Sequence, residues 1–271
     1  MPRAQVNGAD LYYEVAGEGE PLVLVHGSWT DHRSWSPVVP ALAASYRVVT
    51  YDRRGHGRST APAGAGSRTQ DEDDLAALVE RLDVAPAHVV GNSFGASTAL
   101  GLAARRPEWF RSLVAHEPPL LETVAGDPEL EPLMREMQGR IDAVVDSLRA
   151  GDDRGGAYRF VEEVALGPGM WEKLTDAVRD TFIANAATFS DEQADPHWAG
   201  LDLTGVSGFA APVLLTYGTE SPPWFPRIVG KLDDTIPHAQ VRTFNGAGHV
   251  PHSTHPEQYV ATVRGFLAGS R

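Results

Sequence analysis

The chain has 271 residues, of which 42% are hydrophobic and 22% charged, and it contains no cysteine. A chain of this length can form one large domain or two small ones. Its composition is that of a soluble globular protein. The net charge of −13 argues against binding to DNA, RNA or an anionic membrane, where Lys and Arg must meet phosphates. The lack of cysteine excludes disulfides and thiolate nucleophiles and fits a cytoplasmic protein. We identify no secretory signal and no apolar run of ~20 residues.

Apolar runs alternate with helical spacings along the first part of the chain. The predicted strands are residues 11–15, 21–25, 47–51, 88–90 and 111–115. The predicted helices between them are residues 36–45, 70–82 and 96–105. Such alternation is typical of an α/β fold with a mostly parallel central sheet flanked by helices.

The alternation stops at about residue 121. Helical patterns without a convincing strand follow, at residues 130–148, 156–166 and 171–187. Strand patterns return at residues 212–217 and 239–244, before a final helix at residues 256–268. We therefore expect a core domain of residues 1–121 and 206–271 with an inserted all-helical cap at residues 122–205; two successive domains are the alternative.

The strongest local motif is Gly91-Asn92-Ser93-Phe94-Gly95. It matches G-x-S-x-G, directly after a predicted strand and directly before a predicted helix. A serine on such a sharp turn needs small neighbours, which the flanking glycines supply. The N-terminus of the following helix directs its N–H groups and positive dipole end at the same point, where they would stabilise an oxyanion. The motif predicts a nucleophilic serine.

Two other strand ends carry residues that can complete such a site. Ser28 lies in the loop that begins at His26, and backbone N–H groups there can join the Phe94 amide in an oxyanion hole. His249 follows the last predicted strand in a glycine-rich loop, from which it can act as a general base. We interpret His26 as structural. Competing histidines near the base are His252 and His255.

Taken together, these motifs resemble the α/β-hydrolase superfamily. The matching segments are His26-Gly27, residues 51–59, residues 91–95 and Gly248-His249. The resemblance covers about residues 8–121 and 211–267, and the helical insertion resembles the family's cap by position only. It implies Ser93 as the nucleophile, His249 as the base, and the main-chain amides of Ser28 and Phe94 as oxyanion donors. It also implies that residues 52–59 are scaffold.

The acid of the triad departs from the family's pattern. The family usually places an aspartate after the strand that ends here at Tyr217, but that position is Ser221. Glu220 is one residue early. Glu117 follows the strand at residues 111–115 and precedes two prolines that could direct it toward the site. We favour Glu117 as the acid with Glu220 as the alternative, and we expect a Glu117 carboxylate oxygen within about 3 Å of His249 Nδ1. His116 should point to the other face of the strand.

Neither a metal-binding spacing nor a phosphate-binding or dinucleotide-binding loop is present, so no metal or cofactor is implied. The sequence predicts a serine hydrolase that cleaves a carboxylic ester or lactone of a small, mainly apolar substrate through an acyl-enzyme. The alternatives are a ligand receptor or binding protein, and a non-hydrolytic cyclase or lyase, on the same scaffold. The expected partner is a small molecule, and a homodimer stays open. The residues expected to line an apolar pocket are Trp29, Met134, Met137, Trp171, Phe182 and Trp224.

Overall fold

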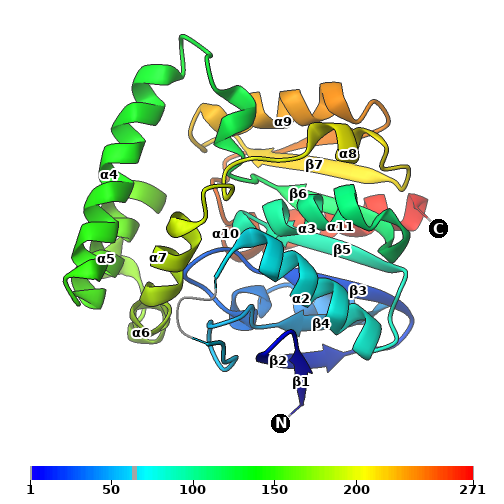
Figure 1. The fold of residues 1–271 in the computed structure, drawn as a ribbon. Coiled ribbons are helices and arrows are strands. Elements are labelled where there is room, and N and C mark those ends of the chain that lie inside the picture. Colours follow the sequence, from blue (N-terminus) through cyan, green and yellow to red (C-terminus); the bar gives the residue numbers. More distant parts are fainter. Residues whose placement is uncertain (1, 63–65, 271) are drawn as a thin grey trace.

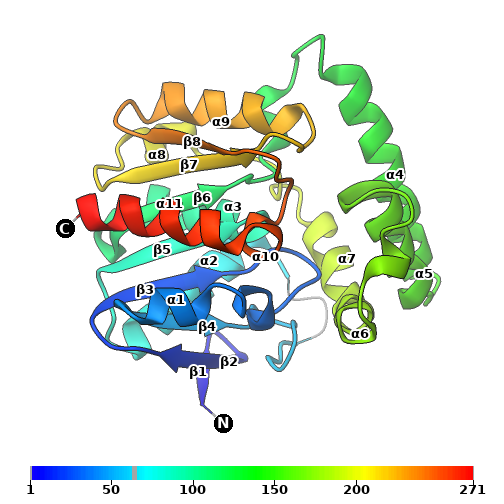
Figure 2. The same ribbon diagram turned by 180° about the vertical axis from the view of Figure 1, so that it is seen from behind.

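A single eight-stranded sheet forms the centre of the computed structural model, which describes residues 2–62 and 66–270. Its order is β1-β2-β4-β3-β5-β6-β7-β8, with β8 labelled in Figure 2 and the other strands in Figure 1. The first two strands are antiparallel to their neighbours, and the remaining pairings, from β4 through β8, are parallel. The strands are β1 (Arg3–Val6), β2 (Ala9–Ala16), β3 (Glu20–Val25), β4 (Tyr46–Tyr51), β5 (Ala87–Asn92), β6 (Phe110–His116), β7 (Val213–Gly218) and β8 (Gln240–Phe244).

Helices cover both faces of this sheet, which confirms the predicted α/β class. One face is covered by α2, α3, α8 and α9, and Figure 2 shows α1 and α11 across the other. The central strands β3 and β5 are buried on both sides, as their almost uninterrupted apolar sequences require. The helices of these layers are α1 (Val39–Ala43), α2 (Arg68–Arg81), α3 (Phe94–Arg105), α8 (Leu203–Ser207), α9 (Trp224–Thr235), α10 (Pro251–Thr254) and α11 (Pro256–Gly269).

Four more helices lie between β6 and β7. They group together beyond one end of the strands, and not over either face of the sheet (Figures 1 and 2). They pack around an apolar core of their own, which includes Val144, Trp171 and Phe182. No strand occurs in residues 121–207, all of which the structure describes, as the sequence predicts. These helices are α4 (Glu131–Arg149), α5 (Asp153–Arg159) with its π-helical continuation η4 (Phe160–Ala165), α6 (Asp176–Ala184) and α7 (Ala186–Ala194).

The structure differs from the predicted elements in several places. The predicted helix at residues 36–45 is only the short α1, preceded by a separate 3-10 turn, His32–Trp35. The predicted helix at residues 171–187 is divided, because Asn185 ends α6 and begins the turn into α7. Sequence reasoning missed β1 and also α9, whose buried face repeats at helical spacing. Among the described residues, none of the helices has the length and apolar character to cross a bilayer.

Candidate active site

Ser93 lies at the tight turn between β5 and α3. Its backbone has φ 56° and ψ −126°, a strained conformation for a residue with a side chain. A Cβ on Gly91 would lie 2.5 Å from the Gly95 carbonyl oxygen, and one on Gly95 would collide with the Val25 carbonyl. The two glycines of the motif are therefore required for this turn to close. The turn directs the N-terminus of the twelve-residue α3 at Ser93.

His249 and Glu117 meet beside this turn. The His249 Nδ1 atom lies 2.6 Å from Glu117 Oε2, which confirms the predicted contact. The Glu117 side chain is fully buried, whereas the His249 side chain is 21% exposed. The Asn92 side-chain amide donates to the His249 carbonyl at 3.0 Å and so fixes the histidine loop against the residue next to Ser93.

Glu117 is held as a carboxylate by its surroundings. Burial by itself raises its pKa, but the hydrogen bond and charge of His249 and the charge of His116 outweigh this effect and lower the pKa to about 2. The Gly218 N–H also donates to Glu117 Oε1 at 2.7 Å. Residue 117 is therefore charged across the neutral pH range.

The expectation that His116 points away from the site is wrong. Its Nε2 lies 3.8 Å from Glu117 Oε2, and its ring centroid lies 6.4 Å from that of His249. The prediction assumed that side chains alternate along an extended strand, but Glu117 has φ 46° and leaves the extended conformation. Burial, opposed in part by the charge of Glu117, lowers the pKa of His116 to about 4, so His116 is neutral at pH 7.

The alternative acid lies elsewhere. Glu220 is exposed, and its backbone N–H pairs with the Ala247 carbonyl at 3.0 Å. Ser221, where the resemblance predicts an aspartate, has a buried hydroxyl without a hydrogen-bond partner among the described residues.

A cavity of about 600 Å³ opens over Ser93 and His249. Ser28 and Phe94, the predicted oxyanion donors, line it as well. Its remaining wall is mostly apolar and comes largely from the helical segment between β6 and β7. The apolar side chains that residues 122–205 contribute to this wall are Met137, Ile141, Phe160, Val164, Ala165, Leu166, Met170, Leu174, Val178, Phe182, Phe189 and Trp198.

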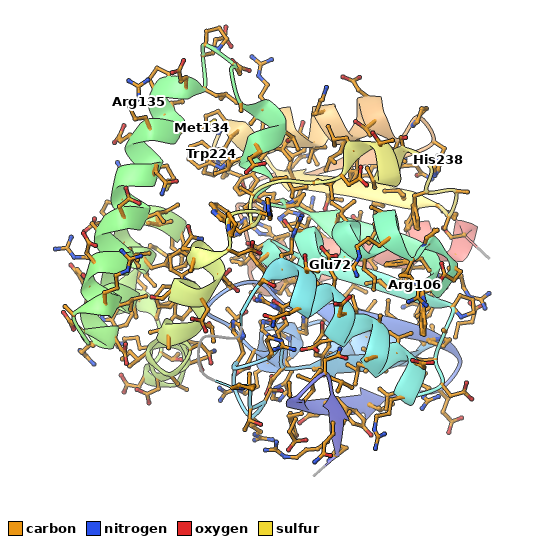
Figure 3. The ribbon with its side chains drawn as sticks, in the orientation of Figure 1. Glu72, Arg106, Met134, Arg135, Trp224 and His238 are labelled. Atoms are coloured by element: carbon orange, nitrogen blue, oxygen red, sulfur yellow. The ribbon has the colours of Figure 1, made fainter. Side chains whose placement is uncertain are left out.

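Three of the six expected pocket residues line this cavity: Met137, Phe182 and Trp224. The other three, Trp29, Met134 and Trp171, do not, and the prediction is corrected for them. Trp29 is fully buried in the apolar cluster of helices α4 to α7, with its ring stacked 4.7 Å from that of Phe160. Trp171 belongs to the same cluster. Figure 3 shows Met134 on α4 and Trp224 at the start of α9.

The family model for alpha/beta hydrolases matches residues 22–262. The chain belongs to the alpha/beta hydrolase family. The uncharacterized hydrolase YraK of Bacillus subtilis is 42% identical over 125 residues, covering 45% of this chain and 46% of that protein. A 2-hydroxymuconate semialdehyde hydrolase of a Pseudomonas species is 29% identical over 266 residues, covering 93% and 88%. An alpha/beta hydrolase structure from Sphaerobacter thermophilus superposes with a TM-score of 0.79 at 25% identity, covering 98% of this chain and 100% of that one.

The first curated relatives match over less than half of their own length. The family model thus establishes the family, and the activities of these relatives do not carry over to this chain by similarity alone.

The other histidines of the hydrolase have separate surroundings. His26 donates from Nδ1 to the Gly27 carbonyl at 2.7 Å and accepts at Nε2 from the Arg53 N–H at 2.9 Å, in keeping with a structural role. His252 lines the cavity, but its ring packs on Trp35 with centroids 4.5 Å apart. His255 is half-buried and lies next to the Thr254 hydroxyl.

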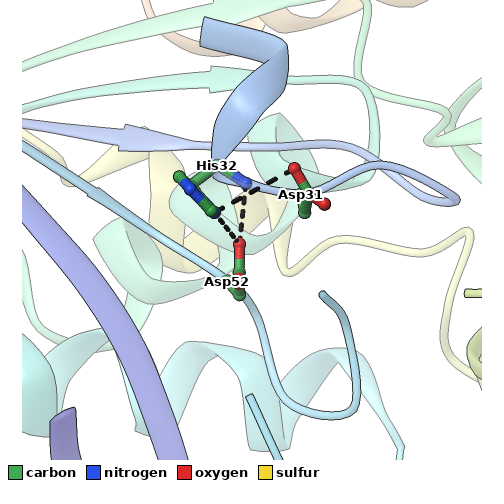
Figure 4. A group of neighbouring side chains, drawn as sticks. All are labelled: Asp31, His32 and Asp52. Carbon is green, nitrogen blue, oxygen red and sulfur yellow. Dashed lines mark hydrogen bonds and ion pairs between the residues drawn. The ribbon is translucent and has the colours of Figure 1, made fainter. Parts of the chain in front are cut away.

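One cluster of the hydrolase has the composition of a metal site. Asp31, His32 and Asp52 are buried with their polar atoms within 4.8 Å of one another (Figure 4). Their oxygens already accept protein hydrogen bonds: Asp52 Oδ1 from the backbone N–H of His32 at 2.8 Å and from its Nδ1 at 2.6 Å, and Asp31 from Arg33. Burial opposes but does not overcome the pull of Asp52, which raises the pKa of His32. This donor set suits a charged histidine between carboxylates better than a cation.

Two residues lie beside the candidate site although no sequence pattern predicts that they do. Arg53, expected as scaffold, lies with its guanidinium carbon 4.6 Å from the centre of the Phe94 ring. Glu192 on α7 accepts a hydrogen bond from the Ser28 hydroxyl at 2.6 Å. Their proximity depends on how helices α4 to α7 pack on the rest of the chain, which no local pattern encodes.

Proposed function

We propose that the protein is a serine hydrolase that cleaves a carboxylic ester or lactone of a small, mainly apolar compound through an acyl-enzyme. Ser93 is the nucleophile, His249 the base and Glu117 the acid of its triad. The observation that carries the proposal is the 2.6 Å contact between His249 Nδ1 and Glu117 Oε2 beside the strained Ser93 turn. A carboxylate on Nδ1 leaves Nε2 as the atom that accepts the serine proton.

In the first half of the reaction, Ser93 Oγ attacks the carbonyl carbon while His249 Nε2 takes the hydroxyl proton. The carbonyl oxygen becomes negative and is stabilised by the amides of Ser28 and Phe94 and by the N-terminus of α3. Collapse of this intermediate breaks the bond to the alkoxide leaving group, which receives the proton from His249. The acyl group stays on Ser93.

In the second half, a water molecule gives its proton to His249 and attacks the acyl carbon. The second tetrahedral intermediate expels Ser93, which regains its proton, and the carboxylic acid leaves. Glu117 stabilises the imidazolium in both halves and stays ionised throughout, consistent with its pKa of about 2.

The cavity supports the proposed substrate class. Its volume of about 600 Å³ and its apolar cap wall favour a compound with a compact apolar acyl or alcohol part. We propose residues 122–205 as the cap that supplies this wall. A relative that matches along most of its length is named for 2-hydroxymuconate semialdehyde, so that compound belongs in the substrate panel beside esters and lactones.

The test is the reaction of the purified protein with a fluorophosphonate probe and with p-nitrophenyl esters of two to eight acyl carbons. Ser93→Ala is expected to abolish labelling and to lower kcat by more than about 1,000-fold with an unchanged melting temperature. Hydrolysis by Ser93→Ala at near the parent rate would refute the assignment. A parent protein that binds apolar ligands but neither labels nor turns over would be a binding protein. Turnover of a non-ester substrate that survives Ser93→Ala would indicate a cyclase or lyase.

A further inference from the structure

The loop that carries Ser28 is fastened to the cap by a buried carboxylate. The Ser28 hydroxyl donates to Glu192 Oε2 at 2.6 Å. Glu192 belongs to α7 and is only 3% exposed. A carboxylate in this position needs partners because its desolvation is otherwise uncompensated. Ser28 is one of these partners, although the two residues are 164 positions apart in the sequence.

The same carboxylate also reaches the second amide of the oxyanion hole through Arg53. The Arg53 Nη2 atom donates to Glu192 Oε1 and, at 3.0 Å, to Asp71 Oδ2. The guanidinium then lies over the ring of Phe94, 4.6 Å from its centroid. Arg53 is 1% exposed, so these contacts occur away from solvent, where charge-assisted bonds are strong. One oxygen of Glu192 thus holds Ser28, and the other holds the cation packed on Phe94.

A second cap residue supports the same loop. Asn185, at the junction of α6 and α7, donates from Nδ2 to the carbonyls of Trp29 at 3.2 Å and Thr30 at 3.1 Å. Its Oδ1 accepts from the Gly57 N–H at 2.8 Å. The backbone next to Ser28 is therefore tied to the cap at consecutive residues.

We propose that Glu192 is a positioning residue through which the cap sets the geometry of the oxyanion hole. This inference rests on the proposed function, because it takes the amides of Ser28 and Phe94 as the oxyanion donors. An oxyanion hole works only when its donors lie 2.7–3.1 Å from the developing charge, and a misplacement of about 1 Å costs on the order of 100-fold in rate. Glu192 touches neither the substrate nor the reacting atoms; it acts through Ser28 and Arg53.

The test uses two variants of the full-length protein that break this connection with little change of shape. Ser28→Ala keeps the backbone N–H and removes only the hydroxyl, and Glu192→Gln keeps the size of the side chain and removes its charge. For each, kcat and KM are measured with p-nitrophenyl butyrate, together with the rate of fluorophosphonate labelling and the melting temperature. The matched control is Asp195→Asn. Asp195 also joins the cap to the core, because it accepts a hydrogen bond from the Arg68 N–H at 2.9 Å. Among the described residues, it makes no hydrogen bond to the loop that carries Ser28.

We expect Ser28→Ala to lower kcat and the labelling rate by about tenfold and Glu192→Gln by about ten- to 100-fold, with KM within about twofold of the parent. The double variant should be no slower than Glu192→Gln alone, because both changes break one connection. Ser28→Thr, which retains the hydroxyl, should keep most of the activity. Asp195→Asn should lower the melting temperature without changing kcat or labelling.

The outcomes separate this inference from the proposed function. A parent protein that the probe does not label would overturn both. Labelling of the parent with undiminished kcat in Ser28→Ala and Glu192→Gln would overturn the positioning role alone. It would also be overturned if Asp195→Asn slowed labelling as much as Ser28→Ala does, because the effect would then be a general loosening of the cap.

Discussion

Replacement of Glu117 by glutamine is the most direct probe of the triad. The substitution keeps the size of the side chain and removes the charge facing His249 Nδ1 at 2.6 Å. The surroundings lower the pKa of Glu117 from 4.5 to about 2, which corresponds to roughly 3 kcal/mol in favour of the carboxylate. Much of this attraction is to His249, and the same attraction stabilises the imidazolium in the transition state. We therefore expect kcat to fall by at least about 100-fold, toward the ~10,000-fold loss seen when other triads lose their charge.

The assay is the kcat for p-nitrophenyl butyrate hydrolysis at pH 8, with circular dichroism to verify folding. Glu220→Gln is the matched control, since Glu220 is exposed and should change kcat by less than about twofold. Adding Ser221→Asp to Glu117→Gln should recover part of the activity, because the Ser221 hydroxyl lies beside the His249 loop, 4.0 Å from where a Cβ on Gly248 would stand. A folded Glu117→Gln protein with near-parent kcat, or an equal loss in Glu220→Gln, would show that the carboxylate acts from elsewhere.

Two further predictions concern stability and substrate size. Burial, with nearby positive charges, lowers the pKa of His26 and His116 to about 4, of His252 to about 3, and of His56 well below its usual value. The unfolded chain therefore binds protons below about pH 6.5 that the folded state does not bind. Stability should fall as the pH drops from 6.5 to 4, by about 1.4 kcal/mol per pH unit for each of these four histidines. Urea unfolding at pH 6.5, 5.5 and 4.5 measures this slope, and His252→Phe should reduce the slope by about a quarter; a flat profile would contradict the prediction. For the cavity, Met137→Trp places a larger side chain on the wall. It should lower the ratio of kcat/KM for octanoate esters to kcat/KM for acetate esters by about tenfold or more. Met134→Trp is the control: it lies one turn earlier and off the cavity wall, so this ratio should stay unchanged.

The parts of the molecule that the sequence could predict are those fixed by local pattern. Apolar runs predict the buried strands, and two flanking glycines predict the turn at Ser93. The contact between Glu117 and His249 follows from topology, because the carboxyl ends of parallel strands meet at one edge of the sheet.

Other features depend on how the cap meets the core. An apolar ring suits a pocket wall and a hydrophobic core equally well, so the sequence could not place Trp29 or Trp171. Met134 and Met137 lie on neighbouring strips of α4, and only the packing of that helix decides which of them reaches the cavity. His116 was misplaced because the backbone turn at Glu117 has no signature in residue type.

The position of Trp29 has a consequence for engineering this protein. The ring is supplied by the core yet fills the interior of the cap, where it packs on Phe160, Phe182 and Phe189. Cap and core are therefore not interchangeable modules. A chimera that receives this cap without Trp29 would contain a hole the size of an indole, at a cost of about 3–5 kcal/mol. Transfer of these helices to a relative must therefore include the short segment after β3 that carries Trp29.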